Sequence, residues 1–371
     1  MLSIRAAEAA GPYTLVAMED GVVTRRSVRR DRAFRGIDSA VRWRLGAMRY
    51  EMAGGQVRDP ASPQEFWDGS RVHDPAPVAA TAEWEHRKSR EFRLEGPSSG
   101  PGDHPGSRKL IATAHLNPSA APDAPLILIV HGYAVPLPFW DALMGRRLRA
   151  RGAHTILIDL PFHLRRRVPG RNSGDGFFGA DPARIRATVQ QSVEDAAALV
   201  EWAREHVTPT VAVMGVSLGG LIASLLASQV RLDCAVAVAP LCDPPSTFLE
   251  NMPHNLARRL GLTATSGGAW GEDRAQARAM LDASLAPLVP RYLVPRTSPE
   301  NITLVRPELD LIVGPQPIAD LAAAWGVEMW DYRQGHITVM NAPGIGSRIR
   351  DRLLEPSRSL GDDSVPAAAA V

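Results

Sequence analysis

The sequence predicts an α/β fold with a mostly parallel central sheet and helices on both of its faces. From about residue 83 to residue 354, apolar runs of strand length alternate with longer stretches of helical periodicity. Such alternation requires right-handed crossovers, which cover both faces of a parallel sheet with helices. A second observation is that His131 and Ser217 directly follow strand-like runs. In sheets of this kind, chemistry takes place at the carboxyl ends of the strands.

Composition limits the classes of protein to consider. The chain has 371 residues, of which 45% are hydrophobic and 22% are charged, with a formal net charge of +2. This balance is ordinary for a globular protein with a substantial core. It does not favour a nucleic-acid partner, and no apolar run is long enough for an integral membrane segment. Composition leaves the oligomeric state open.

Two cysteines, Cys234 and Cys242, lie eight residues apart in one expected strand. An extended segment would hold them roughly 26 Å apart, too far for a disulfide. We therefore expect packed free thiols and a cytoplasmic, reducing location. No Cys/His spacing indicates a zinc site, so no metal is predicted.

Residues 1–82 are predicted to be an N-terminal extension that packs on the core. This segment is Arg-rich and poorly periodic, with one expected helix over 37–52 and Pro-rich loops near 59–63 and 74–77. The main domain then covers 83–354. It opens with two expected antiparallel strands, 85–94 and 109–116, on either side of a Gly/Pro/Ser-rich loop.

The alternating elements follow in order. Residues 126–130 and 155–160 read as strands on either side of a helix over 140–151. Asp181-Pro182 is a good helix start, and the apolar residues after it recur at helical spacing. Strands are next expected at 211–214 and 234–238, with a helix over 218–229 between them.

The rhythm breaks at 244–298, which is predicted to be a helical cap insertion over the carboxyl edge of the sheet. It resumes with strands at 302–305 and 309–313, a helix at 318–325 and a strand at 327–332. A last helix is weakened by Pro343, Gly344 and Gly346. The tail, 355–371, is expected to be disordered.

The most informative motif is the Gly-x-Ser-x-Gly pentad that runs from Gly215 to Gly219. A strand-like run enters it and an apolar helix-like run leaves it. This pattern is typical of a nucleophile elbow, a sharp turn that projects Ser217 above the sheet toward backbone N–H groups. The competing interpretation is a glycine-rich turn with an idle serine.

Four landmarks occur in order: His131-Gly132 after an apolar strand, the Ser217 pentad, an acid after a late strand, and Gly335-His336. With these landmarks the chain resembles the α/β-hydrolase superfamily from about residue 83 to residue 354. The segments 159–167 and 215–220 resemble its uncharacterised abhydrolase-18-like branch. The resemblance implies a serine nucleophile, an acid and a histidine base in that order along the chain.

His336 is the expected base, because a histidine can take the proton of Ser217 near neutral pH and return it to a leaving group. Asp310 is the expected acid by its match to the family's late-strand segment. Glu308 and Asp243 remain rivals. The elbow implies an oxyanion hole formed by the N–H of Leu218, with a second donor at Tyr133 or Ala134. His131 is interpreted as structural support.

Substrate contacts are also predicted. Arg165, in a loop with two further arginines, could receive an anionic group. Phe177 and Phe178, together with apolar cap residues, could line an acyl pocket. Solvated or ion-paired arginines and plain core packing are the alternatives.

The resemblance implies a serine hydrolase that cleaves a carboxylic ester or thioester through an acyl-serine intermediate, without a cofactor. The expected substrate is a small-molecule or lipid ester. The alternatives are an acyltransferase or lipase-like enzyme acting on an anionic lipid, and an inactive hydrolase-fold binding protein.

Overall fold

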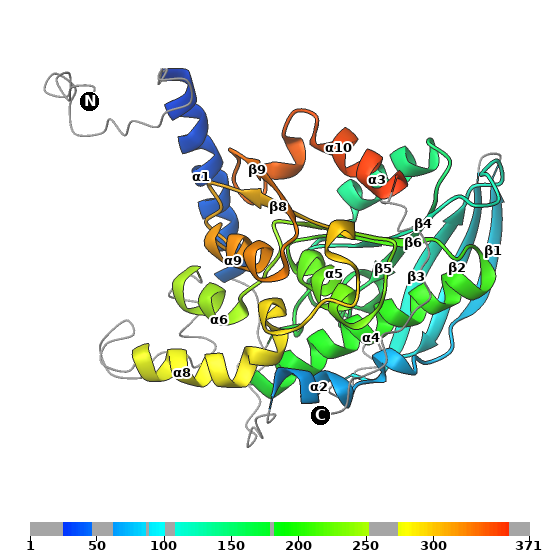
Figure 1. Ribbon diagram of the computed structural model, residues 1–371, viewed down its shortest axis with the longest axis horizontal. Coiled ribbons are helices and arrows are strands. Elements are labelled where there is room, and N and C mark those ends of the chain that lie inside the picture. The colour runs from blue at the N-terminus through cyan, green and yellow to red at the C-terminus, as the bar shows by residue number, and fades with distance from the viewer. Residues whose placement is uncertain are drawn as a thin grey trace, which may run out of the picture.

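The computed structural model describes residues 25–46, 62–86, 89–100, 108–178, 182–251 and 274–355 (Figure 1). Within these residues one nine-stranded sheet forms the centre, in the order β1-β2-β3-β5-β4-β6-β7-β8-β9. The strands are β1 Ala79–His86, β2 Ser89–Pro97, β3 Lys109–Leu116, β4 Leu126–Val130, β5 His154–Asp159, β6 Val211–Val216, β7 Cys234–Val238, β8 Ile302–Pro307 and β9 Glu328–Tyr332.

The sheet has an antiparallel part and a parallel part. Strands β1, β2, β3 and β5 pair antiparallel in that order, whereas β5, β4, β6, β7, β8 and β9 pair in parallel. In the parallel part, β4 and β7 are buried at every residue. Continuous apolar strands of this kind are expected where helices cover both faces. The parallel arrangement brings the carboxyl ends of β4, β6, β8 and β9 to one edge.

Helices cover the sheet in two layers. One core joins α3 and α10 to one face of the strands, and a larger core joins α4, α5 and α9 to the other. The helices are α1 Arg25–Gly46, α2 Pro63–Asp68, α3 Phe139–Arg149, α4 Pro182–His206, α5 Leu218–Gln229, α6 Pro244–Ser246, α8 Arg274–Leu285, α9 Gln316–Trp325 and α10 Ile345–Leu354. As predicted, α4 begins at Pro182.

The described part of the expected cap consists of α6, a π-helical turn at Thr247–Asn251, and α8. Helix α8 packs against α4 and α6 (Figure 1). Residues 252–273 lie outside the described residues, so the covering role of the cap stays a prediction.

The sequence placed several strand boundaries wrongly. The expected strand at 85–94 is a β1–β2 hairpin, and β1 begins at Ala79, so the sheet starts inside the presumed extension. The expected strand at 309–313 is a loop, because the Asp310 carboxylate accepts the backbone N–H groups of Ile312 and Val313 that a strand would offer to its neighbour. Pro343 and Gly344 precede α10 instead of interrupting it.

The two cysteines are buried free thiols. Burial raises the pKa of Cys234 to about 12 and that of Cys242 well above its ordinary value. None of the helices in the described residues is long and apolar enough to cross a membrane. Of the tail expected at 355–371, only Glu355 belongs to the described residues. It directly follows α10 as its C-cap.

Candidate active site

Ser217 lies on the turn between β6 and α5. Its backbone has φ 58° and ψ −115°, a conformation that residues with side chains rarely adopt. Such strain persists only where the surroundings enforce it, and it is found at functional sites. Here the Ser217 N–H donates to Val238 O and the Ser217 carbonyl accepts from Leu221 and Leu241, which fixes the turn.

The glycines of the pentad are sterically required. A Cβ atom at Gly215 would lie 2.0 Å from Gly219 O, and one at Gly219 would lie 2.1 Å from Val130 O. A Cβ at Gly220 would meet Pro240 at 2.9 Å. Since these obstacles belong to the first turn of α5, to the end of β4 and to the loop after β7, the turn can form only where glycines let these segments approach.

His336 follows β9 and reaches Ser217 from across the edge of the sheet. Its Nε2 lies 2.8 Å from Ser217 Oγ, a hydrogen-bonding distance for a serine that donates its proton to the ring. The imidazole is 5% exposed. The serine and the histidine, 119 residues apart in sequence, are therefore in direct contact.

Of the three acid candidates, the structure places Asp310 beside the histidine. Asp310 Oδ2 accepts a 2.7 Å hydrogen bond from His336 Nδ1, and its Oδ1 is held by the Ile312 and Val313 N–H groups. Asp243 instead caps α6 and pairs with Arg291 at 2.7 Å. Glu308 is exposed. The two ring nitrogens of His336 bond to Asp310 and Ser217, and to neither rival among the described residues.

Two opposing effects set the pKa of His336. Burial by itself lowers this pKa, because it disfavours the charged imidazolium. The carboxylate of Asp310, and to a smaller degree that of Asp38, favours the charged form, and the net result is a raised pKa. The His336 ring can therefore accept the proton of Ser217 and keep it, although burial disfavours the charged ring.

The loop after β4 lies against the elbow. A Cβ at Gly132 would be 3.7 Å from Ser217 Cβ, so the two turns are neighbours. The Ala134 N–H donates to His163 Nε2 at 3.1 Å. Because this donor is engaged, Tyr133 is the better of the two proposed second donors. The Leu218 N–H belongs to the first residue of α5, where backbone donors have no partner within the helix.

Two buried histidines support this loop. His131 Nδ1 donates to Gly132 O at 2.7 Å, and its Nε2 accepts from Leu160 N–H at 3.1 Å. His163 Nδ1 donates to Pro161 O at 2.8 Å. Burial lowers the pKa of His163 well below its ordinary value, which keeps the ring neutral and able to accept. These contacts agree with the structural role expected for His131.

Sequence analysis missed Asp38, on α1. This carboxylate is 0% exposed and accepts from the N–H groups of His336 at 2.8 Å, Ile337 at 3.2 Å and Leu311 at 3.2 Å. One signal was present: Asp38 follows Asp31 by seven residues, two helical turns, in an otherwise Arg-rich segment. Asp31 pairs with Arg333, three residues before His336, at 2.7 Å.

Comparison with known proteins now bears on this arrangement. A family model described as the alpha/beta hydrolase fold matches residues 125–265. Sequence comparison with curated proteins finds no significant match. The chain has the alpha/beta hydrolase fold. The match runs from β4 through the Ser217 turn and past β7, and the strand order extends the same fold to β8 and β9.

Solved structures agree on the hydrolase fold. Acetyl xylan esterase 1 from Thermoanaerobacterium sp. JW/SL YS485 is 16% identical, with a TM-score of 0.58 over 85% of this chain and 98% of that one. Acetyl xylan esterase from Paenibacillus sp. R4 is 14% identical, with a TM-score of 0.57 over 83% and 98%. At these identities the likeness shows the fold alone. The abhydrolase-18-like branch stays a prediction.

The two phenylalanines expected in a substrate pocket of this hydrolase fold behave differently. Phe177 is 0% exposed and packs against Tyr133 and His163, and its substrate contact stays a prediction. Through its contact with Tyr133, Phe177 supports the loop after β4. Phe178 is 7% exposed and has ring contacts with Tyr133 and with Phe248 of the cap segment, so it joins the two regions.

The three arginines after β5 have separate roles. Arg165 forms a bidentate pair with Asp159, at 2.7 and 3.0 Å, which offsets its charge. Arg166 is 0% exposed and pairs with the buried Asp195 at 2.7 Å. Arg167 is exposed. The predicted anionic site therefore has one exposed, partly neutralised arginine in Arg165 and a second exposed one in Arg167.

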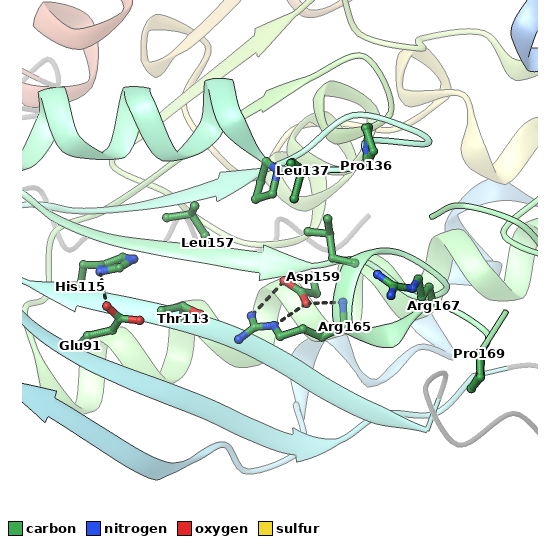
Figure 2. A pocket seen from close by; sticks show the side chains of 12 residues that line it. Glu91, Thr113, His115, Pro136, Leu137, Leu157, Asp159, Arg165, Arg167 and Pro169 are labelled. Atoms are coloured by element: carbon green, nitrogen blue, oxygen red, sulfur yellow. Dashed lines mark hydrogen bonds and ion pairs between the residues drawn. The ribbon is translucent and has the colours of Figure 1, made fainter. Parts of the chain in front are cut away.

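Arg165 and Arg167 line a cleft of about 740 Å³, next to the loop after β4. Figure 2 shows Pro136 and Leu137 on one side of the cleft, and Thr113, His115 and Glu91 on the strands below it. Leu137, Phe139 and Trp140 are 74%, 61% and 49% exposed. The lining of the cleft thus combines the cationic Arg165 and Arg167 with apolar residues. The apolar segment begins at Pro136, three residues after Tyr133 in the sequence.

Proposed function

We propose that the protein is a serine hydrolase that cleaves a carboxylic ester or thioester through an acyl-serine intermediate. The observation that carries the proposal is the continuous hydrogen-bonded line from Ser217 through His336 to Asp310, with links of 2.8 and 2.7 Å. A serine, a base and an orienting acid in this geometry form the arrangement that activates a serine hydroxyl.

In the proposed reaction, Ser217 Oγ attacks the carbonyl carbon of the substrate and its proton moves to His336 Nε2. Asp310 holds Nδ1–H and stabilises the imidazolium. The N–H groups of Leu218 and Tyr133 donate to the oxyanion. The intermediate then expels the alcohol or thiol, which takes the proton from His336. Water, activated by the same ring, releases the acid from Ser217. These steps require no cofactor.

Enzyme assays must determine whether the leaving group is an alcohol or a thiol. The two esterases with this fold act, by their names, on acetyl esters, so p-nitrophenyl acetate is the first substrate to test. A longer p-nitrophenyl ester series and an acyl thioester distinguish acyl length and thioester cleavage. The expected partner is a small-molecule or lipid ester.

A lipase-like or acyltransferase activity on an anionic lipid is the second candidate. The exposed Leu137, which lines the same cleft as Arg167, favours it, because an apolar surface with a cation fits an amphiphile that carries a negative head group. This activity would increase with acyl length and fall as salt is added. An acyl acceptor other than water would identify the transferase.

Labelling by a fluorophosphonate tests the proposed nucleophile. We expect covalent labelling of the wild type and none of Ser217→Ala. Ser224→Ala is the matched control, since Ser224 is a buried serine on α5 whose hydroxyl donates to Gly220 O. Labelling of Ser217→Ala at the wild-type rate, or no labelling of the wild type, would overturn the proposal. The latter result would favour a binding protein on a hydrolase scaffold.

We also propose a cytoplasmic location. Cys234 and Cys242 are both buried thiols whose raised pKa values keep them protonated and unreactive, as suits a protein that needs no disulfide. Cell fractionation tests this, and recovery of the protein in an oxidising compartment would contradict it.

A further inference from the structure

We infer that Asp38, on the N-terminal helix α1, is a positioning residue that holds the loop of His336 in its reactive place. This inference rests on the proposed function, because it concerns how the base is presented to Ser217. It assigns an active-site role to a segment that precedes the sheet in sequence.

The first support is the direction of the hydrogen bonds. Both oxygens of Asp38 face backbone donors: Oδ2 accepts from His336 and Leu311, and Oδ1 accepts from Ile337. His336 and Ile337 belong to the loop after β9, whereas Leu311 directly follows Asp310 after β8. One buried carboxylate therefore ties together the two loops that carry the proposed base and acid.

The second support is steric. A Cβ at Gly335 would lie 2.9 Å from Asp38 Oδ2 and 3.0 Å from its Oδ1. Only glycine at this position lets the carboxylate approach the backbone of the loop. The glycine of the Gly335-His336 pair is thus explained by a residue 298 positions away from the histidine.

The third support is the attachment of α1. Arg333 at the start of the loop makes a bidentate pair with Asp31, two turns before Asp38, with contacts of 2.7 Å from Nη2 to Oδ2 and 3.3 Å from Nε to Oδ1. Figure 1 shows α1 alongside β9 and α9 at the edge of the sheet. The helix is therefore docked at two places, one on each side of Gln334 and Gly335.

Charge is the fourth support. His336 faces Asp310 from the β8 loop and Asp38 from α1; Arg42, one turn further along α1, interacts electrostatically with Asp38. Both carboxylates favour the imidazolium and raise its pKa against the opposing effect of burial. Loss of the charge at Asp38 alone lowers that pKa, so the acid limb of kcat/KM moves to lower pH.

The test compares Asp38→Asn and Asp38→Ala with Asp31→Asn in the full-length protein. Asp31→Asn is matched because it removes the same charge from the same helix and weakens docking without contact to His336. We expect both Asp38 variants to lose roughly 10- to 100-fold in kcat and in the rate of fluorophosphonate labelling, with little change in KM. Asp31→Asn should lose far less.

Two readouts separate positioning from a general loss of structure. The acid limb of kcat/KM should move to lower pH in Asp38→Asn and stay in place in Asp31→Asn. Amide hydrogen exchange of residues 336 and 337 should accelerate in the Asp38 variants, because Asp38→Ala removes both acceptor oxygens and Asp38→Asn replaces one of them with an NH₂ donor. If Asp38→Ala fails to fold, the nearly isosteric Asp38→Asn provides the same comparison.

The outcomes distinguish this inference from the proposed function. Labelling of the wild type but not of Ser217→Ala, together with wild-type rates, pH profile and amide exchange in Asp38→Asn, overturns only the role of Asp38. An unlabelled wild type overturns the proposed function, and the positioning of a catalytic base falls with it. In that case faster exchange at 336 and 337 still shows that Asp38 holds the loop.

Discussion

The serine turn and the histidine loop reach the same point in space by different means. Everything that shapes the Ser217 turn lies within the pentad and the strands that flank it, where backbone atoms approach to distances that only glycine permits. The His336 loop is held by side chains, Asp38 and Asp310, which come from other segments. One half is built from local backbone sterics and the other from long-range hydrogen bonds.

This difference teaches which half tolerates change. A backbone obstacle cannot move without shifting a core strand, so a substitution in the elbow damages the fold. A side-chain carboxylate can rotate away, so a substitution in the histidine loop can leave the fold intact and remove alignment alone. The following experiments test that contrast, from the largest expected effect to the smallest.

Gly219→Ala should prevent stable folding. Its new Cβ would lie 2.1 Å from Val130 O and 2.7 Å from His131 O, both backbone atoms of β4 and its loop. We expect a loss of unfolding free energy of about 4 kcal/mol or more, measured by chemical denaturation. Gly152→Ala is the control: it has φ 99° but open space around its Cβ, so it should cost only about 1–3 kcal/mol of backbone strain. Equal stability of the two variants would contradict the contrast.

Asp310→Asn should fold but lose about 10⁴-fold in kcat. The Ile312 and Val313 N–H groups require an oxygen, which turns the new NH₂ group toward His336 Nδ1. The ring must then accept at Nδ1 and carry its proton on Nε2, where it can no longer take the proton of Ser217. Steady-state kinetics with circular dichroism check both parts.

The same substitution has a consequence for pH dependence. Wild-type kcat/KM should fall as the pH drops through the pKa of His336, which Asp310 and Asp38 raise despite burial. In Asp310→Asn the residual activity should fall at a lower pH, because the charge that favours the imidazolium is gone. An unmoved or higher acid limb would show that another group controls the profile.

Gly335→Ala should fold and lose roughly 10- to 100-fold in kcat. The three atoms nearest to its Cβ would all belong to the carboxylate of Asp38, which can turn aside at a cost of about 1–3 kcal/mol in stability. Combined with Asp38→Ala it should lose little further activity, since both changes break one contact. Additive losses in the double variant would count against a shared mechanism.

Gly36→Ala should give the smallest effect, a gain of up to about 1 kcal/mol in the stability of α1. Gly36 lies within α1 and a Cβ there meets nothing within 4 Å. Slower amide exchange along α1, with kcat unchanged, is the expected result. A fall in kcat would mean that α1 must move during turnover.

The two halves also differ in how far the sequence predicts them. The Ser217 turn could be predicted from a short stretch of sequence, the pentad with the strand-like run before it and the helix-like run after it. Asp310 could be predicted from its match to the family's late-strand segment and His336 from its order along the chain, although the loop conformation at 309–313 was mistaken for a strand. A carboxylate that accepts local N–H groups has no periodic signature in sequence, so that loop looked like an apolar strand.

Asp38 could not be predicted in the same way. Its partners are backbone N–H groups, which every residue except proline offers, so nothing in the sequence of the histidine loop specifies a distant acceptor. The packing of Phe177 and the ion pair of Arg165 could not be predicted for a related reason. Whether an aromatic ring faces a pocket or the core, and whether an arginine is already paired, depends on packing and not on composition.

The hydrogen bond between Asp38 and His336 also limits how early the proposed active site can form while the protein is being synthesised. At about 5–20 residues per second, the 298 residues between them take roughly 15 to 60 s to synthesise. Throughout that interval the Asp38 carboxylate lacks the N–H group of His336, whereas the turn between β6 and α5 is synthesised well before His336. The proposed active site can therefore be completed only late in synthesis. This happens in one step, when the ribosome has released the loop that carries His336.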